Sequence, residues 1–144
     1  MNPKSTIISD VKRIELNRIT DHNGSISVVQ NSLDIPFDVK RIYYLYDIPS
    51  GSERGGHAHK FLQQLIIAAS GSFDIILDDG KQKTTINLNR PNIGLLLPPG
   101  LWRELNNFSS GSICLVLASH EYDEQDYLRD YNEFLVFKAI FNAK

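Results

Sequence analysis

Short apolar segments separated by turn-forming residues run along most of this 144-residue chain, and they constrain its fold more than any other feature. The segments are rich in β-branched and aromatic residues, with Gly, Pro, Asn and Asp between them, which is the pattern of an all-β protein. Asp79-Gly80, between two alternating segments, predicts a tight hairpin. We expect strands at Thr6–Ile8, Val11–Leu16, Ser25–Gln30, Val39–Tyr46, Phe61–Ser70, Phe73–Asp78, Lys83–Leu88, Gly94–Leu97, Trp102–Asn106 and Ser112–Ala118.

No long helical period interrupts these strands, so they are expected to pair with near neighbours in an antiparallel barrel or jelly roll. The C-terminal part differs, because Asp123 can cap a short helix over Glu124–Arg129. Phenylalanines in Tyr131–Phe141 then have helical spacing, although the β-branched residues there also permit a strand. In either form this segment is expected to cover the barrel. The length fits one domain over 1–144.

Composition narrows the class of protein. A net charge of −2 and 22% charged residues argue against disorder and against a nucleic-acid binder. The longest apolar run, Leu65–Ala69, is far below the roughly 20 residues of a membrane span, and the first residues lack the apolar segment of a signal peptide. We therefore expect a soluble, cytoplasmic protein without a membrane partner. The single cysteine, Cys114, lies in an apolar run and is expected in the core.

The most unusual local sequence is Arg54-Gly-Gly-His-Ala-His-Lys60. On a strand, His57 and His59 point to the same side, roughly 6.6 Å apart. Such a pair also occurs as structural or surface histidines, so the surrounding spacing decides its interpretation. The spacing is set by Gly51, His57, His59, Gln64 and Gly71.

This spacing resembles the first cupin motif, and Pro98-Pro-Gly100 followed by Arg103 and Asn107 resembles the second. The resemblance implies a cupin-type antiparallel β-barrel. In metal-binding cupins the two histidines, an acid and a third histidine hold the metal. Here Gln64 stands at the position of the acid and Arg103 at that of the third histidine. Because a guanidinium is not a metal ligand and an amide carries no charge, we expect no tight metal site.

A closer resemblance is to the sugar 3,4-ketoisomerases that act on dTDP-4-keto-6-deoxyglucose. The matching stretches are Ile35–Asp47, Arg54–Lys60, Gly71–Gly80 and Leu117–Tyr131. The resemblance implies a dTDP-linked 4-keto-6-deoxyhexose substrate, a homodimer with exchanged N-terminal strands, no metal or other cofactor, and His57 and His59 as catalytic residues. Arg103 departs from the histidine that this family leads us to expect after Trp102.

Histidine suits this reaction. Moving a ketone from C4 to C3 requires removal of the C3 proton, an enediol or enediolate, and protonation of C4. An imidazole with a pKa near 6.5 can accept and donate protons at neutral pH. If Arg103 faces the barrel interior, its charge keeps both histidines neutral and stabilises an enediolate. If Arg103 points outward, it is expected to pair with an acid.

The substrate diphosphate requires cations or backbone donors. We rank Arg54, directly before the paired histidines, above Arg41 on an earlier strand. Among the tyrosines of that strand we choose Tyr44 for the sugar or the base, and Gln64 and Arg103 complete the binding set. The acidic run Glu121–Glu133 is interpreted as a solvated face, and His22 and His120 as structural residues.

Other classes of protein remain open at this point. They are a non-catalytic carbohydrate-binding cupin, a related nucleotide-sugar 3,5-epimerase, and a metal-dependent cupin enzyme. A passive sugar site needs no pair of groups that titrate near neutrality, and an epimerase needs a base at two ring positions. The residues do not decide between thymidine and uridine, nor the configuration at C4 of the product.

Overall fold

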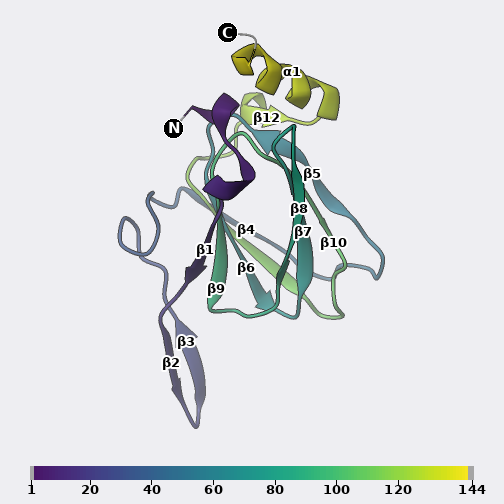
Figure 1. Ribbon diagram of the computed structural model, residues 1–144. Coiled ribbons are helices and arrows are strands. Elements are labelled where there is room, and N and C mark those ends of the chain that lie inside the picture. The colour runs from purple at the N-terminus through teal and green to yellow at the C-terminus, as the bar shows by residue number, and fades with distance from the viewer. Residues whose placement is uncertain (1, 143–144) are drawn as a thin grey trace.

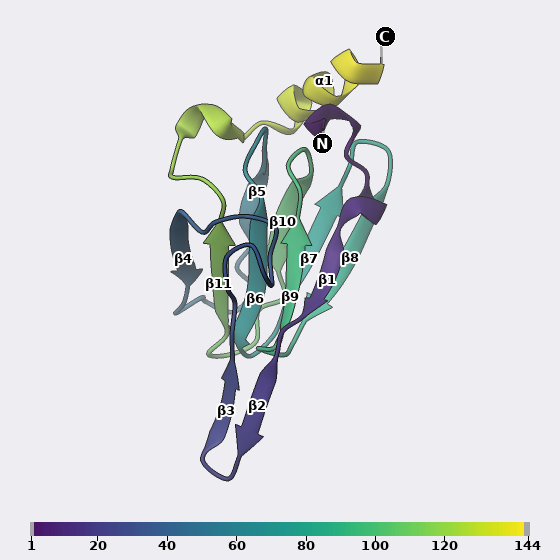
Figure 2. The ribbon, with the colours of Figure 1, turned by 90° about the vertical axis from the view of Figure 1, so that its left-hand side faces the viewer.

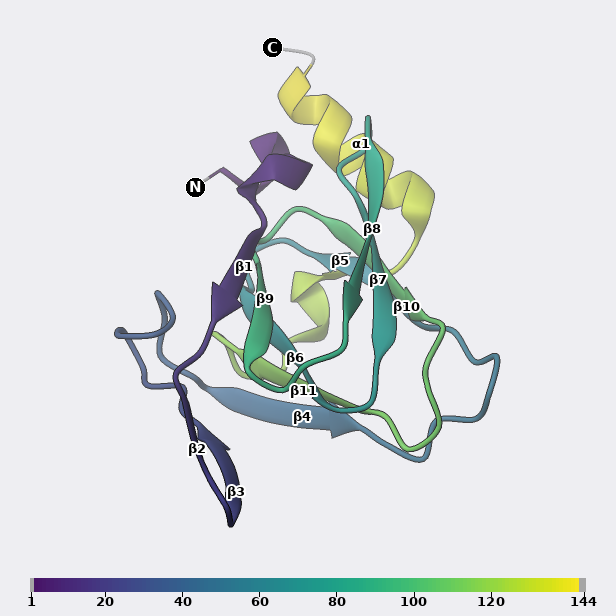
Figure 3. The same ribbon diagram turned by 60° about the horizontal axis from the view of Figure 1, so that its bottom comes forward.

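The computed structural model describes residues 2–142, and most of its ordered elements are β-strands (Figure 1). Two five-stranded sheets, ordered β1-β9-β6-β11-β4 and β12-β5-β10-β7-β8, face each other, and every strand pair is antiparallel (Figures 1 and 3). The strands are β1 (Lys12–Glu15), β2 (Arg18–Asp21), β3 (Gly24–Ser27), β4 (Arg41–Leu45), β5 (Arg54–His59), β6 (Gln64–Ser70), β7 (Phe73–Asp78), β8 (Lys83–Leu88), β9 (Ile93–Leu97), β10 (Trp102–Asn106), β11 (Ile113–Ala118) and β12 (Tyr127–Leu128).

The core lies between the two sheets, where alternate residues of each strand point inward. In β7, for example, Phe73, Ile75 and Leu77 are fully buried, and they contact side chains of β6, β9 and β11. Each such side chain contributes roughly 1.5–3 kcal/mol by leaving water. Cys114 is buried in the same cluster, as predicted. The predicted all-β, cupin-type antiparallel barrel is therefore confirmed.

The strands predicted at Phe73–Asp78, Lys83–Leu88 and Trp102–Asn106 are confirmed residue for residue. The prediction at Thr6–Ile8 is wrong, because that region forms the 3-10 turns η1 (Pro3–Ser5) and η2 (Ile8–Asp10). Asn2 caps the first turn, and the Asp10 carboxylate accepts a hydrogen bond from Ile7 N at 2.8 Å. These local side-chain bonds occupy backbone donors that a strand would use.

Other predicted elements also differ from the structure. Phe61–Gln63 precede β6 rather than belong to it, because Phe61 N donates to Asp126 and Gln63 N to Ser119. Asp123 caps a helical turn as predicted, but this η3 (Glu124–Asp126) ends where β12 begins, so no helix runs to residue 129. The strands β2 and β12 were not among those predicted, and β5 is the strand assumed for His57 and His59.

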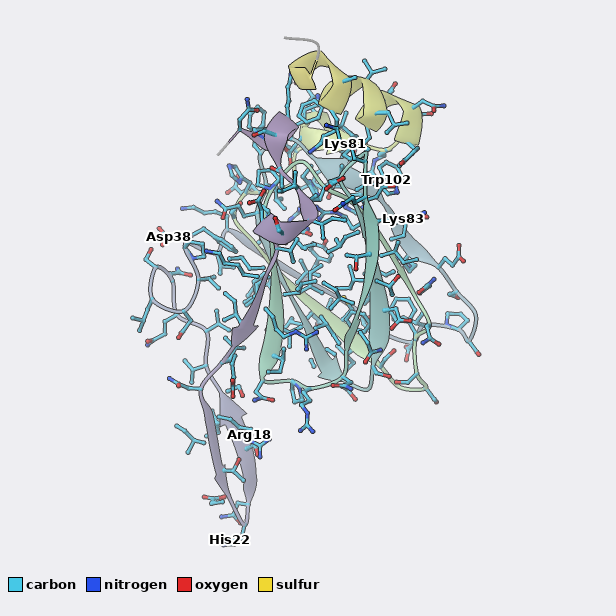
Figure 4. All side chains as sticks on the ribbon, in the orientation of Figure 1. Arg18, His22, Asp38, Lys81, Lys83 and Trp102 are labelled. Carbon is cyan, nitrogen blue, oxygen red and sulfur yellow. The ribbon has the colours of Figure 1, made fainter. Side chains whose placement is uncertain are left out.

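The C-terminal segment is a helix, α1 (Tyr131–Asn142), that covers one end of the barrel beside the N-terminal turns (Figures 1 and 2). Its Phe134 is buried against Trp102, Leu128 and Ala58, and Figure 4 labels Trp102 just below the helix. At twelve residues, α1 is too short to span a bilayer, and no helix within residues 2–142 has the length and apolar character that a membrane crossing requires.

A buried lysine joins the helix to the N-terminal turns. The Lys138 ammonium donates to the carbonyls of Thr6 at 2.6 Å, Gly100 at 2.9 Å and Pro3 at 3.3 Å. The contact requires glycine at position 100, where φ is +89° and an added Cβ would lie 1.8 Å from the Pro3 carbonyl oxygen. The backbone of Gly100 also donates to His59 O at 2.8 Å, so this junction adjoins the strand that carries the paired histidines.

Replacing Lys138 by Met is expected to lower the free energy of unfolding by about 2 kcal/mol, because it leaves buried carbonyls without their donor. The loss stays moderate because burial already disfavours the ammonium and lowers the pKa of Lys138 to about 8. Thermal and urea unfolding would measure the change. Lys81→Met is the control, since Lys81 is exposed in the β7–β8 hairpin. Equal stability of the two variants would contradict the role of Lys138.

Candidate active site

An open cavity of about 380 Å³ lies between the sheets. Four guanidinium groups and three tyrosines line it together with one of the paired histidines. Apolar side chains of β6, β10 and β11 complete the wall. The lining residues are Arg41, Ile42, Tyr43, Leu45, Arg54, Gly55, His57, Gln64, Ile66, Arg103, Leu105, Val116, Tyr122, Tyr127 and Arg129.

The pairing of β5 with β10 directs His57 into this cavity. His57 lies opposite Arg103, and cross-strand neighbours share a face of the sheet. The register then shifts, so that Gly55 and Gly56 together oppose Glu104. This bulge requires a positive φ, which is +85° at Gly55. Because of the extra residue, Arg54 and His57 both reach the cavity although they are three residues apart.

A continuous hydrogen-bonded chain connects the two histidines to a carboxylate. His57 Nε2 lies 3.1 Å from His59 Nε2, and His59 Nδ1 lies 2.9 Å from Asp126 Oδ2. His59 is completely buried, and Asp126 is 9% exposed. The interpretation of the acidic run as a solvated face is therefore wrong for Asp126. The one signal in the sequence is the apolar pair Tyr127-Leu128 directly after it, which forms β12 against β5.

Both imidazoles are neutral at neutral pH. Burial, followed by the charge of Arg103, lowers the pKa of His57 to about 2. Burial also lowers the pKa of His59 to about 4, against the raising effect of its hydrogen bond to Asp126. Burial tends to raise the pKa of the Asp126 carboxyl, but the hydrogen bond from His59 and backbone donors hold it below its ordinary value.

These charge states determine the tautomers. An ionised Asp126 only accepts hydrogen bonds, so His59 Nδ1 carries a proton and its Nε2 does not. The hydrogen bond between the two Nε2 atoms then requires the proton on His57 Nε2. His57 Nδ1 is consequently the unprotonated nitrogen, and a backbone hydrogen bond with Gly55 favours the protonated form of the ring by raising the pKa of His57 against the larger effect of burial.

Arg103 faces the barrel interior, which is one of the two orientations that the sequence left open. It is 2% exposed, donates through Nη1 to Gln64 Oε1, and donates through Nε and Nη2 to the Leu101 carbonyl. Burial lowers its pKa to about 10, so it remains charged. These contacts use three of its five N–H bonds and leave one on each Nη for a ligand. Gln64 in turn donates to Tyr43 Oη at 3.0 Å.

Of the β4 tyrosines, Tyr43 lies at the cavity and Tyr44, the one chosen from the sequence, does not. Residues 41, 43 and 45 of β4 line the cavity, whereas Tyr44 is 58% exposed and contacts Tyr46 on the outer face. Arg41 lies over the ring of Tyr43, and its buried Nε has no hydrogen-bond partner among the described residues. Arg54 also lines the cavity, as expected, but its side chain is exposed.

The donor set at this cavity does not fit a divalent metal. A charged guanidinium stands where the third histidine of a metal-binding cupin would be, and it occupies the oxygen of Gln64. Residues 2–142 contain no cluster of three or more His, Cys, Asp or Glu side chains suited to a metal. Of the other histidines, His22 lies at the tip of the β2–β3 hairpin (Figure 4), and His120 contacts Ser119 outside the cavity.

Comparison with known proteins agrees with this geometry. The FdtA family, described as WxcM-like, C-terminal, matches residues 9–139. A TDP-4-oxo-6-deoxy-alpha-D-glucose-3,4-oxoisomerase of Aneurinibacillus thermoaerophilus is 41% identical over 133 residues, covering 92% of this chain and 96% of the relative.

Two solved structures are also similar over nearly their whole length. A 3,4-ketoisomerase from Helicobacter canadensis has 47% identity and a TM-score of 0.88, with 90% of this chain and 98% of that chain covered. The sugar 3,4-ketoisomerase QdtA from Thermoanaerobacterium thermosaccharolyticum, solved in complex with TDP, has 37% identity and a TM-score of 0.91, with 94% and 98% covered. The resemblance predicted from the motifs is thus confirmed, and the chain belongs to the FdtA, WxcM-like family.

Proposed function

We propose that this chain is a sugar 3,4-ketoisomerase that moves the carbonyl of a TDP-linked 4-keto-6-deoxyhexose from C4 to C3. The observation that carries the proposal is a neutral, partly buried His57 at the cavity wall, connected to His59 and Asp126 and opposed by the cation of Arg103. The 3,4-ketoisomerase and 3,4-oxoisomerase activities after which the similar proteins are named support the same reaction.

The proposed reaction begins when His57 removes the proton from C3. The electron pair of the broken C–H bond forms a C3–C4 double bond, and the C4 carbonyl becomes an enediolate oxygen. The free N–H bonds of Arg103 are placed to stabilise that charge. The C3 hydroxyl then loses its proton to become the new carbonyl, C4 gains a proton, and the C4 oxygen is protonated. No electron leaves the sugar, so the proposed reaction requires no redox cofactor.

The nucleotide diphosphate is proposed to bind to the guanidinium groups of Arg41, Arg54 and Arg129 at the cavity. Arg41 supports this role because its buried Nε lacks a partner, which an anionic ligand would supply. The Tyr43 hydroxyl and Gln64 lie deeper and are proposed to contact the sugar.

Incubation with TDP-4-keto-6-deoxyglucose in D2O, followed by NMR of the sugar, tests the proposal. We expect a 3-keto product with deuterium at C4, at the same rate before and after dialysis against a strong chelator. Deuterium at C5 would indicate a 3,5-epimerase instead. Tight binding without turnover would indicate a carbohydrate-binding protein, and activity restored only by added metal would contradict the role given to Arg103.

We also propose a homodimer in which the N-terminal arms are exchanged. The segment predicted for exchange contains β1, which pairs with β9 of its own chain, but the following β2–β3 hairpin projects from the barrel (Figure 2). Its Ile19 and Ile26 are 64% and 63% exposed, so a partner surface would shield apolar area from water. We expect sedimentation of a dimer at micromolar concentration, with Ile19→Ser/Ile26→Ser shifting the population toward monomer. A monomeric unmodified chain would contradict this proposal.

A further inference from the structure

The hydrogen-bonded chain from His57 does not end in the protein interior. Its last member, Asp126, lines a second hollow of about 740 Å³. Among the described residues, Tyr122 alone lines both hollows. The lining residues of the second hollow are Lys40, Phe61, Ser119, His120, Glu121, Tyr122, Asp123 and Asp126.

The position of His59 restricts where its protons can go. Its ring is completely buried and is absent from the linings of both hollows. One ring nitrogen contacts His57 and the other contacts Asp126. A proton that reaches His59 can therefore leave only toward the cavity through His57, or toward the second hollow through Asp126.

Asp126 is suited to pass such a proton to water. One carboxylate oxygen accepts from His59, and the other accepts from Phe61 N at 2.7 Å, which fixes the carboxylate plane. About a tenth of the side chain remains exposed. The titratable groups beside it in the second hollow are Lys40, His120, Glu121, Tyr122 and Asp123.

We propose that Asp126 connects the histidine pair to solvent in the second hollow, so that the proton taken from the sugar leaves and returns there while the nucleotide sugar fills the cavity. The proposal rests on the proposed function. His57 Nδ1 accepts the C3 proton, and His57 Nε2 passes its proton to His59 Nε2. His59 Nδ1 then passes its proton to Asp126 Oδ2, and Asp126 gives a proton to water. The same transfers in reverse restore the proton that C4 requires.

The first test follows the His59 Nδ1–H proton by NMR in ¹⁵N-labelled protein, with the signal assigned by its loss in His59→Asn. Exchange of this proton with water is measured by saturation transfer, with and without saturating TDP in the cavity. We expect exchange to continue with TDP bound, at a rate close to that of the free protein. Exchange that stops when TDP binds would overturn the proposal, because the only route would then be the cavity.

The second test uses Asp126→Gly in single turnovers of TDP-4-keto-6-deoxyglucose. We expect the rate to fall by roughly 10²-fold, and formate to recover about tenfold of it, because this small carboxylate can enter the vacated space from the second hollow. Glu121→Gln, which removes another carboxylate from the same hollow, is the control and is expected to keep the full rate.

The outcomes separate the two proposals. An Asp126→Gly protein that folds and binds TDP, but that formate does not rescue, would reduce Asp126 to a residue that only orients His59, and would overturn the route. A wild-type chain that neither binds TDP nor converts the sugar would instead contradict the proposed function. Normal wild-type turnover together with TDP-blocked exchange would contradict the route alone.

Discussion

Replacing His57 by Asn is expected to lower kcat by roughly 10⁴-fold, at the upper end of what general acid–base catalysis contributes. The imidazole is the basic group that lines the cavity, and an amide cannot accept a proton at neutral pH. KM for the nucleotide sugar is expected to change little, because the proposed diphosphate contacts lie on other residues. Steady-state kinetics on the folded variant would measure both constants.

The corresponding His59→Asn variant is expected to lose roughly 10²-fold, because His59 acts on the sugar only through His57. The position of His59 deeper along the strand, farther from Gly55 and Gly56, would by itself favour the opposite order. The cavity lining supports the revised order, since it includes His57 and not His59. His120→Asn is the matched control. If both single variants isomerise the sugar at the wild-type rate, the pair is not catalytic and a sugar-binding role becomes the better explanation.

Replacing Arg103 by Met is expected to lower kcat by roughly 10²- to 10³-fold, the usual effect of removing a group that stabilises a developing oxyanion. It is also expected to move the acid limb of kcat/KM to higher pH. His57 must be unprotonated to act as a base, so activity falls as the pH drops through the pKa of His57. The charge of Arg103 lowers that pKa, after burial, and its removal lets the pKa rise toward 6.5.

The pH profiles of the wild-type chain and Arg103→Met would be compared over the range in which both remain folded. For the wild type we expect no loss of kcat/KM from protonation of His57 until well below pH 6.5, since burial and Arg103 hold its pKa at about 2. Arg90→Met is the control for removal of an arginine outside the cavity, and it is expected to leave the profile unchanged. An acid limb at the same pH in Arg103→Met would contradict the effect of Arg103 on the pKa of His57.

The sequence predicted the barrel strands well where hydrophobic alternation and turn residues agree, as in Phe73–Asp78 and the Asp79-Gly80 hairpin. It failed where a distant side chain binds the backbone. Phe61 N is held by Asp126, 65 residues later, and no local pattern carries that information. The prediction of a strand at Thr6–Ile8 failed for a second reason. Asn2 and Asp10 cap the N-terminal turns with short-range hydrogen bonds, and these override the strand preference of the segment.

The residues of the site also differ in how well the sequence predicted them. His57, His59, Gln64 and Arg103 were identified because motif spacing relates them, and the structure brings all four together. Asp126 was missed because it lies among exposed acidic residues and is joined to His59 only by the pairing of β12 with β5. The choice between Tyr43 and Tyr44 was undetermined, since both faces of β4 carry tyrosine and only the packed sheet defines which face is inside.

The two-glycine bulge in β5 makes this site more sensitive to insertions and deletions than to substitutions. Loss of one glycine would move the following residues by one position and rotate each to the opposite face of the strand. Both imidazoles would then point toward Trp102 and Phe134 beneath the helix, and the methyl group of Ala58 would replace them at the cavity. We therefore expect evolution to hold the length of the segment before the histidines fixed and to keep glycine at position 55, where φ is positive.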